Sequence, residues 1–375
     1  MPHLTVERPS DSMLTRGDAA RSALIEGDDV LTYGDLRRRV SDRQAELDLR
    51  RRSLVLLTGG RTVEWVVTYL ALLDDHHVPL LGGDQHGQLG STWNPDAVVH
   101  AQPDRVSVSH TRMAGRVLHP ALALLLSTSG STGSPKLVRL SRRNLMANAD
   151  AIVDVLGLQE EDRGITSLPL HYCYGLSVLH AHLAAGASLV CTEASVVDPC
   201  FAGAVRAHQV TSVAGVPHSF AMLERTDPER FAVPSLRLLT CAGGAMPIDA
   251  VNRWSDRCER WGADLVLMYG QTEATARMAY LPPALARSRP TAIGMPIPGG
   301  RLRLDPVADV DDGVGELVYT GPNVMMGYAA VEADLASGDN LDELRTGDLA
   351  RRGTDGLFEV VGRRSRFIKP FGVRV

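Results

Sequence analysis

A loop rich in glycine and hydroxyl side chains carries the strongest chemical signal in the sequence. It reads Ser-Thr-Ser-Gly-Ser-Thr-Gly-Ser-Pro-Lys and spans residues 127–136. Gly130 and Gly133 allow the backbone to approach a bulky anion closely, while hydroxyl groups, backbone amides and the ammonium of Lys136 supply donors and positive charge. The loop therefore predicts a polyphosphate site, and an ordinary surface turn is the alternative. Its hydroxyl-bearing candidates are Ser127, Thr128, Ser129, Ser131 and Thr132.

The segments on either side of this loop predict its place in the fold. Residues 121–126 form a short apolar run followed by a turn signal, which indicates a buried strand. After the loop, residues 141–158 have apolar positions three and four apart and predict a helix capped by Ser141 or Asn144. The loop is not a P-loop, because no Gly-Lys-Ser or Gly-Lys-Thr follows at the required spacing.

Three later stretches contain residues suited to binding a nucleotide and a cation. A predicted strand and turn end in Gly243, Gly244 and Ala245, where bare backbone can lie against a flat ring. The next predicted strand ends in Tyr-Gly-Gln-Thr-Glu, and the carboxylate of Glu273 is the ligand type that magnesium takes beside phosphates. A structural surface carboxylate is the alternative for Glu273. Further on, Asp348 is a carboxylate that could accept hydrogen bonds from two adjacent hydroxyl groups of a ligand.

Together these stretches resemble the adenylate-forming superfamily of acyl-CoA synthetases, aryl-acid ligases, luciferases and peptide-synthetase adenylation domains. Ser-Gly-Ser-Thr-Gly-Ser-Pro-Lys is similar to its phosphate loop, and Tyr-Gly-Gln-Thr-Glu and Thr-Gly-Asp-Leu follow in the order of the superfamily. The resemblance implies that a small-molecule carboxylic acid attacks the α-phosphorus of ATP, which releases pyrophosphate and leaves an acyl-adenylate. It further implies Mg2+ as a cofactor, and transfer to the thiol of CoA or of phosphopantetheine on an acyl carrier protein. The class implied is an acid–thiol ligase.

The resemblance also implies individual roles. Tyr269, followed by Gly270, would stack on adenine, and Thr272 would contact the α-phosphate. Asp348 and Arg363 match the ribose contacts of the superfamily. The residues implied in catalysis are Thr128, Lys136, Thr272 and Glu273, of which Glu273 and Thr128 are the implied metal ligands.

A substrate-facing segment is implied as well. His171 matches the histidine of a Pro-x-x-His motif, and Tyr174 and Gly175 follow it. Amino-acid-activating members commonly have an aspartate where this sequence has Gly175, and an α-ammonium group buried without that counter-charge costs several kcal/mol. We therefore expect an acyl or aryl acid without an α-amino group. Val216 and Pro217 match the floor of the acyl pocket, with a plain strand-to-helix turn as an equal interpretation.

The order of predicted elements indicates an α/β fold. Residues 53–58 and 78–81 predict buried strands and residues 63–73 predict the helix between them, which is typical of a parallel unit. From residue 291 onward, short β segments alternate with glycine and proline, as in a small barrel or meander. We expect two parallel-rich sheets flanked by helices, plus a small β-barrel-like subdomain.

Composition narrows the function classes. The 375 residues are 44% hydrophobic, and the net charge of −5 favours neither nucleic acid nor an anionic membrane as a partner. Five cysteines without a Cys-x-x-Cys pair predict neither a metal site nor a disulfide framework, and His180 and His182 are interpreted as structural histidines. No apolar run approaches the ~18 residues of a membrane span, so we expect a cytoplasmic protein.

The predicted domain organisation is one large domain over residues 1–364. It contains an α/β part at 1–290 and a β-rich part at 291–364, and a hinge stub follows at 365–375. In the superfamily a mobile domain with the lysine that stabilises the adenylation transition state comes next. We expect impaired turnover in this form, whether it is a truncated piece or a natural stump.

Other function classes make different predictions. A nucleotide-binding protein without catalysis would bind ATP without turning it over. A protein-interaction scaffold would have degraded motifs, which the intact loops contradict. Within the enzyme class, an amino-acid adenylation domain is the alternative, and it predicts that an ammonium-bearing acid binds best despite Gly175.

Overall fold

The computed structural model describes residues 13–83, 86–111, 115–127, 136–308 and 310–364. Most of the predicted phosphate loop and the predicted hinge at 365–375 lie outside the described residues. The loop residues concerned are Thr128, Ser129, Gly130, Ser131, Thr132 and Gly133.

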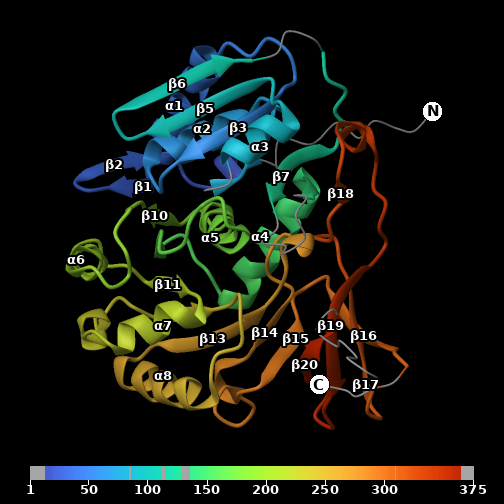
Figure 1. Cartoon of the computed structure of the whole chain (residues 1–375). Coiled ribbons are helices and arrows are strands. Elements are labelled where there is room, and N and C mark those ends of the chain that lie inside the picture. Colours follow the sequence, from blue (N-terminus) through green and yellow to red (C-terminus); the bar gives the residue numbers. More distant parts are fainter. Residues whose placement is uncertain (1–12, 84–85, 112–114, 128–135, 309, 365–375) are drawn as a thin grey trace.

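Helices and strands alternate through the first two thirds of the chain, and strands dominate the last third (Figure 1). The helices are α1 (Tyr33–Leu47), α2 (Val63–Asp74), α3 (His86–Trp93), α4 (Arg142–Leu156), α5 (Cys173–Ala184), α6 (Pro199–Ala207), α7 (Pro217–Glu224) and α8 (Ile248–Trp261), with the short 3-10 helices η2 (Met13–Thr15), η4 (Pro228–Phe231), η5 (Thr272–Ala274), η6 (Pro283–Leu285) and η7 (Glu332–Ala336). The first ten strands are β1 (Ser22–Glu26), β2 (Asp29–Thr32), β3 (Leu54–Gly59), β4 (Val78–Leu81), β5 (Ala97–Gln102), β6 (Arg105–His110), β7 (Leu122–Ser127), β8 (Leu137–Ser141), β9 (Arg163–Ile165) and β10 (Ser188–Val190). The others are β11 (Ser212–Gly215), β12 (Leu238–Cys241), β13 (Asp264–Tyr269), β14 (Ala279–Leu281), β15 (Ala292–Pro296), β16 (Arg301–Pro306), β17 (Val314–Thr320), β18 (Gly327–Ala329), β19 (Leu344–Arg352) and β20 (Phe358–Arg363).

These strands form two sheets in the described part of the chain. The smaller sheet has the order β18-β8-β7-β4-β3-β5-β6, and the larger has the order β16-β17-β19-β20-β15-β14-β13-β12-β11-β9-β10-β1-β2. Parallel pairing runs from β7 through β5 in the first and from β13 through β1 in the second. The predicted fold class, with two parallel-rich sheets flanked by helices, is confirmed.

The predicted strand-helix-strand unit is present as β3-α2-β4. Thr62 caps α2, because its hydroxyl accepts a hydrogen bond from the backbone N–H of Trp65. β4 has the predicted bounds, and it pairs in parallel with β3 at Leu56 and Leu80. A right-handed crossover through an apolar helix is the usual way to join parallel strands, which is why the apolar pattern predicted this unit.

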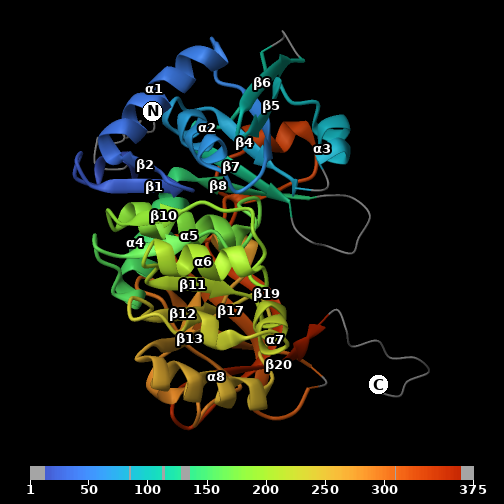
Figure 2. The same cartoon turned by 90° about the vertical axis from the view of Figure 1, so that its left-hand side faces the viewer.

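Helices α4 and α5 lie between the two sheets (Figures 1 and 2). Every residue of α5 is buried, as expected for a helix with apolar side chains on all sides. α4 begins with a capping box, in which Ser141 accepts from the N–H of Asn144 and Asn144 accepts from the N–H of Ser141. Both residues predicted as caps therefore take part.

The β-rich part extends the larger sheet as an antiparallel meander through β15, β20, β19, β17 and β16. β18 leaves this meander and pairs with β8 in the smaller sheet. Tyr328 on β18 is opposite Val138 on β8. The chain thus crosses from one sheet to the other shortly before its last strands.

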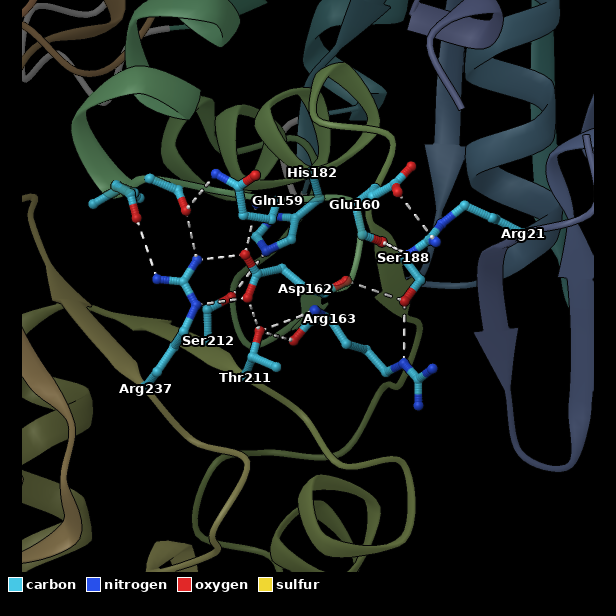
Figure 3. A network of polar contacts seen from close by, with 12 residues as sticks. Arg21, Gln159, Glu160, Asp162, Arg163, His182, Ser188, Thr211, Ser212 and Arg237 are labelled. Atoms are coloured by element: carbon cyan, nitrogen blue, oxygen red, sulfur yellow. Dashed lines mark hydrogen bonds and ion pairs between the residues drawn. The ribbon is translucent and has the colours of Figure 1, made fainter. Parts of the chain in front are cut away.

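A polar network joins the parallel strands β9 to β12 in the larger sheet (Figure 3). Asp162 is 4% exposed and accepts hydrogen bonds from Arg237 Nε at 2.7 Å and from Thr211 Oγ1 at 2.7 Å. Burial alone would raise the pKa of Asp162, but hydrogen bonds from Arg237, from the Gln159 N–H and from Thr211 outweigh it and lower the pKa. The carboxylate therefore stays ionised and bonded within the fold.

Candidate active site

Three segments distant in sequence meet at the carboxylate of Asp348. Tyr269, at the end of β13, donates its hydroxyl to Asp348 Oδ2 at 2.6 Å, and Gln271 Nε2 donates to the same oxygen at 3.0 Å. Arg363, at the end of β20, donates Nε to Asp348 Oδ1 at 2.7 Å. The antiparallel register makes this pair, because Asp348 on β19 lies opposite Arg363 on β20.

The electrostatics of this cluster follow from its burial. Asp348 is 3% exposed, and its charge is balanced by the Arg363 guanidinium. Burial, the charge of Asp348 and the hydrogen bond to it all raise the pKa of Tyr269 well above its ordinary value. The hydrogen bond to Asp348 raises the pKa of Arg363. Tyr269 is therefore a protonated donor, and the cluster is a fixed arrangement around one carboxylate.

Glu273 lies a short distance along the chain from Tyr269, in η5. Its carboxylate oxygen Oε1 accepts a hydrogen bond from Tyr328 Oη at 2.7 Å, and its backbone carbonyl accepts from the Met325 N–H at 2.9 Å. The preceding residue, Thr272, donates its hydroxyl to Cys173 Sγ at 3.3 Å. Glu273 is half-buried, so its carboxylate is reachable from solvent.

The end of the predicted phosphate loop lies beside Glu273. The ammonium of Lys136 is 5.9 Å from the centre of the Tyr328 ring, and Lys136 is exposed. Ser127, the last residue of β7, is paired with Leu137, the first residue of β8. The two ends of the loop are therefore held by adjacent strands at the place where the Glu273 carboxylate lies.

The glycine segment after β12 is exposed but partly covered. Gly243 has a φ of 81°, and a Cβ at this position would lie 2.5 Å from Oη of Tyr172, so glycine is required both for the backbone and for the close approach. A Cβ at Gly244 would lie 3.5 Å from Pro217, which brings the Val216–Pro217 turn beside this segment. Ala245, the third candidate, is exposed.

A cavity of about 360 Å³ lies near this region. It is lined by Gly59, Gly60, Arg61, Trp65, Ser167, Pro169, Leu170, His171, Glu193, Ser195, Val196, Ser219 and Met222. Arg61 connects two segments that line the cavity, because it donates hydrogen bonds to the backbone oxygens of Thr166 at 3.1 Å and Ala194 at 3.0 Å. His171 is the one predicted substrate residue among those lining it, and residues 171–173 connect the cavity with Thr272.

The family model described as AMP-binding enzyme matches residues 89–329, which is more than half of the chain. This chain belongs to the AMP-binding enzyme family. The predicted resemblance to adenylate-forming enzymes is thereby confirmed.

Individual relatives in the AMP-binding family are acid–CoA ligases by name. The chain is 30% identical over 257 residues to a 2-succinylbenzoate–CoA ligase of Bacillus subtilis, a stretch that covers 66% of this chain and 50% of that protein. It is 33% identical over 254 residues to an indoleacetate–CoA ligase of Aromatoleum aromaticum, covering 65% of this chain and 48% of that protein. The chain spans about half the length of the curated relatives it matches.

Solved structures share the fold. ATP-bound MatB from Rhodopseudomonas palustris superposes with a TM-score of 0.81 at 23% identity, over 97% of this chain and 81% of that one. Unliganded O-succinylbenzoate coenzyme A synthetase from Bacillus subtilis gives a TM-score of 0.76 at 23% identity, over 95% of this chain and 82% of that one.

Four of the expected substrate residues of this AMP-binding chain are not among those that line the cavity, namely Tyr174, Gly175, Val216 and Pro217. Tyr174 is 2% exposed, its hydroxyl lies 2.7 Å from Thr240 Oγ1, and the Arg277 guanidinium lies over its ring at 5.6 Å from the ring centre. Gly175 is buried in α5, where a Cβ would lie 2.3 Å from the carbonyl oxygen of Pro169. A glycine at this position therefore has a packing reason that is independent of the charge of the substrate.

Three residues at the site were missed by sequence reasoning. Tyr172, Arg61 and Glu193 each carry polar atoms at the Gly243 segment or at the cavity. The only signal for Tyr172 was an aromatic residue next to His171. Arg61 follows Gly59, the last residue of β3, and Gly60, at a position where a loop turns toward a ligand site at the carboxyl edge of a parallel sheet.

Among the described residues there is no group of three or more His, Cys, Asp or Glu side chains placed to hold a metal. A single carboxylate fits magnesium if phosphates supply the remaining ligands, and Glu273 Oε2 has no hydrogen-bond donor in the described part of the chain.

His180 and His182 are buried and bonded to Tyr69 and Ser212, which confirms their structural interpretation. The five cysteines are free. None of the described helices combines the length and apolar character needed to span a membrane.

Proposed function

We propose that this chain takes part in ATP-dependent activation of a carboxylic acid to an acyl-adenylate, with release of pyrophosphate. The observation that carries the proposal is the cluster of Tyr269, Gln271 and Arg363 around Asp348, with Glu273 beside it. The proposal assigns adenine, ribose and phosphate binding to neighbouring positions of one site. The acid–CoA ligases among the relatives favour the same reaction.

In this proposal adenine is held by Tyr269, Gly270 and the Gly243–Ala245 segment. Ribose is held by Asp348 and Arg363. Lys136, Thr272 and the loop from Ser127 to Gly133 hold the phosphates. Glu273, with Thr128 as a second candidate, would hold Mg2+, which when bound supplies charge neutralisation on the phosphate oxygens. His171, Tyr174, Gly175, Val216 and Pro217 are the candidates around the acid; of these His171 lines the cavity, while the Tyr174 side chain is buried in the core.

The chemical work of these residues is positioning. A carboxylate oxygen of the acid forms a bond to the α-phosphorus of ATP, and the bond from that phosphorus to the pyrophosphate oxygen breaks. Attack by the substrate itself needs no protein nucleophile, so the chain contributes orientation and donors to the phosphate charge. The thiol that later accepts the acyl group would belong to CoA, or to phosphopantetheine on an acyl carrier protein. We further propose residues 1–364 as the large domain and residues 365–375 as its hinge.

Calorimetric titration with non-hydrolysable acyl-adenylate mimics of the alkyl, aryl and aminoacyl types tests the proposal. Tight binding of an alkyl or aryl mimic is the expected result. Flat traces from a folded sample would contradict it. ATP–pyrophosphate exchange then separates an enzyme from a nucleotide-binding protein without catalysis, because exchange requires the adenylate to form.

An amino-acid substrate is the second candidate, and one side chain favours it. The carboxylate of Glu193 lines the cavity and interacts electrostatically with the Arg61 guanidinium, but it has no hydrogen bond or salt bridge to a described residue, so it could pair with an ammonium group. A Cβ at Gly60 would lie 1.7 Å from Glu193 Oε1, which shows how closely this carboxylate packs on the bare backbone. Preference for an aminoacyl mimic that is lost on Glu193→Gln, with the alkyl and aryl mimics unaffected, would establish this candidate.

A further inference from the structure

We propose that Tyr328 is a positioning residue that holds the Glu273 carboxylate for metal-dependent nucleotide binding. The inference rests on the proposed function, since it takes Glu273 as the metal ligand. Tyr328 Oη donates to Glu273 Oε1 at 2.7 Å, which orients the carboxylate and leaves Oε2 for a cation.

The strand that carries Tyr328 makes this contact possible. β18 leaves the meander of the larger sheet and pairs with β8, so that Tyr328 lies opposite Val138 and Ala329 lies opposite Leu137. Leu137 directly follows the end of the predicted phosphate loop at Lys136. One tyrosine therefore contacts Glu273, 55 residues away in sequence, from the strand adjacent to that loop.

A purely structural role does not account for the exposure of this side chain. Tyr328 is 42% exposed, whereas the aromatic residues of the core are nearly all buried. The Lys136 ammonium lies 5.9 Å from the centre of its ring, and its hydroxyl donates a hydrogen bond to the Glu273 carboxylate. Both partners are polar groups that the proposed function assigns to phosphates and metal. The Tyr328 side chain therefore lies next to both an anionic group of the site, Glu273, and a cationic one, Lys136.

The backbone around Glu273 supports the same geometry. The Met325 N–H donates to the Glu273 carbonyl at 2.9 Å, and the Asn323 side chain donates to the Ala274 carbonyl at 2.8 Å. These bonds fix η5 against the segment that leads into β18. With the backbone fixed, the Tyr328 hydroxyl is left to set the rotamer of the Glu273 side chain.

The test is calorimetric titration of the 375-residue chain with ATP, in saturating Mg2+ and in EDTA, for the native sequence, Tyr328→Phe and Glu273→Ala. Tyr328→Phe keeps the ring over Lys136 and removes only the hydroxyl. We expect it to weaken ATP binding in Mg2+ by about three- to tenfold, the fold-change that matches the net contribution of one typical hydrogen bond, with no change in EDTA. Adenosine binding, which needs neither phosphate nor metal, should also be unchanged.

The double variant and a matched control complete the test. Tyr328→Phe added to Glu273→Ala should cause no further loss, because a positioning residue acts through its partner. Tyr280→Phe removes a hydroxyl that has no hydrogen bond to any described residue, and it should behave as the native sequence. Equal weakening by Tyr328→Phe in Mg2+ and in EDTA would indicate a structural role and overturn the inference.

The two proposals fail in different ways. If Glu273→Ala weakens binding in Mg2+ and Tyr328→Phe does not, the role of Tyr328 is wrong and the site assignment stands. If Glu273→Ala leaves ATP binding in Mg2+ unchanged, the metal assignment of Glu273 is wrong and the role of Tyr328 fails with it.

Discussion

Both carboxylate oxygens of Asp348 accept hydrogen bonds from neighbouring side chains. Arg363 occupies one oxygen, and Tyr269 and Gln271 share the other. A carboxylate has about four acceptor positions, so ribose hydroxyls would have to use the remaining position on the Arg363 side or replace one of these donors. The same carboxylate thus contributes to nucleotide binding and to the packing of three strands.

Replacement of Asp348 by alanine should affect both properties. We expect adenosine affinity to fall by about tenfold or more, irrespective of Mg2+, because bonds to a charged acceptor are lost. The free energy of unfolding should fall by about 1–3 kcal/mol, since the buried hydroxyl of Tyr269 loses its acceptor. Calorimetry with adenosine and urea denaturation measure the two effects.

Asp342→Ala is the matched control for this variant. Asp342 is exposed and makes no hydrogen bond or ion pair with a described residue, so both quantities should keep their native values. Native adenosine affinity in Asp348→Ala would show that the ribose assignment is wrong.

At the scale of single elements, α5 is the most constrained part of the site. It is buried on every side, and its N-terminal turn approaches the backbone of residues 168–169. A Cβ at Gly175 would lie 2.3 Å from the Pro169 carbonyl oxygen and 3.0 Å from that of Leu168. Backbone atoms cannot give way as a flexible side chain can.

Gly175→Ala should therefore destabilise the protein despite the higher helix propensity of alanine. Displacement of α5 in a close-packed interior is expected to cost about 1–3 kcal/mol of unfolding free energy. Gly203→Ala is the matched comparison, because Gly203 lies in α6 with nothing within 4 Å of its Cβ position. That variant should gain about 0.5–1 kcal/mol. Urea denaturation that ranks the two variants in the opposite order would refute the packing explanation for Gly175.

At the scale of the whole molecule, helices between the sheets join the two halves of the core. α5 carries His180, which lies 2.9 Å from Tyr69 Oη on α2, and His182, which lies 2.8 Å from Ser212 Oγ on β11. The two histidines thus connect α5 to elements on both of its sides. Burial lowers the pKa of His180 to about 3 and that of His182 to about 4.

Acid should therefore destabilise the fold before its carboxylates are protonated. Because both histidines are neutral in the folded protein and have a pKa of about 6.5 when unfolded, the unfolded state binds more protons below that pH. The contribution of the two histidines to the free energy of unfolding is fully present above pH 6.5. It is lost as the pH falls toward the folded pKa values, by roughly 1.4 kcal/mol per pH unit for each histidine. Urea denaturation at several pH values between about 7 and 5 measures the slope.

Variants of single histidines distinguish this cause from general acid effects. His182→Gln should lower the stability at neutral pH and reduce the slope with pH. His218→Gln, at an exposed position, should leave the slope as in the native sequence. An unchanged slope in His182→Gln would show that other groups cause the pH dependence.

The sequence by itself determined the local elements and the motifs. Apolar runs and their spacing predicted β3, α2 and β4, with the bounds of β4 correct, because burial of a parallel strand requires a continuous apolar segment. The capping pair Ser141 and Asn144 was also predictable from the sequence, since a cap involves residues only three apart. The family followed from the motifs for the same reason, as each motif is a short contiguous stretch.

The tertiary structure alone decided which segments meet. The Tyr269–Asp348 hydrogen bond spans 79 residues and the Tyr328–Glu273 bond spans 55, and both depend on strand order and register rather than on any local pattern. The burial of Tyr174, the contact of Gly175 with Pro169 and the position of Tyr172 over Gly243 also depend on how α5 packs between the sheets. Such contacts are set by close packing of the whole core, which residue spacing along the chain does not encode.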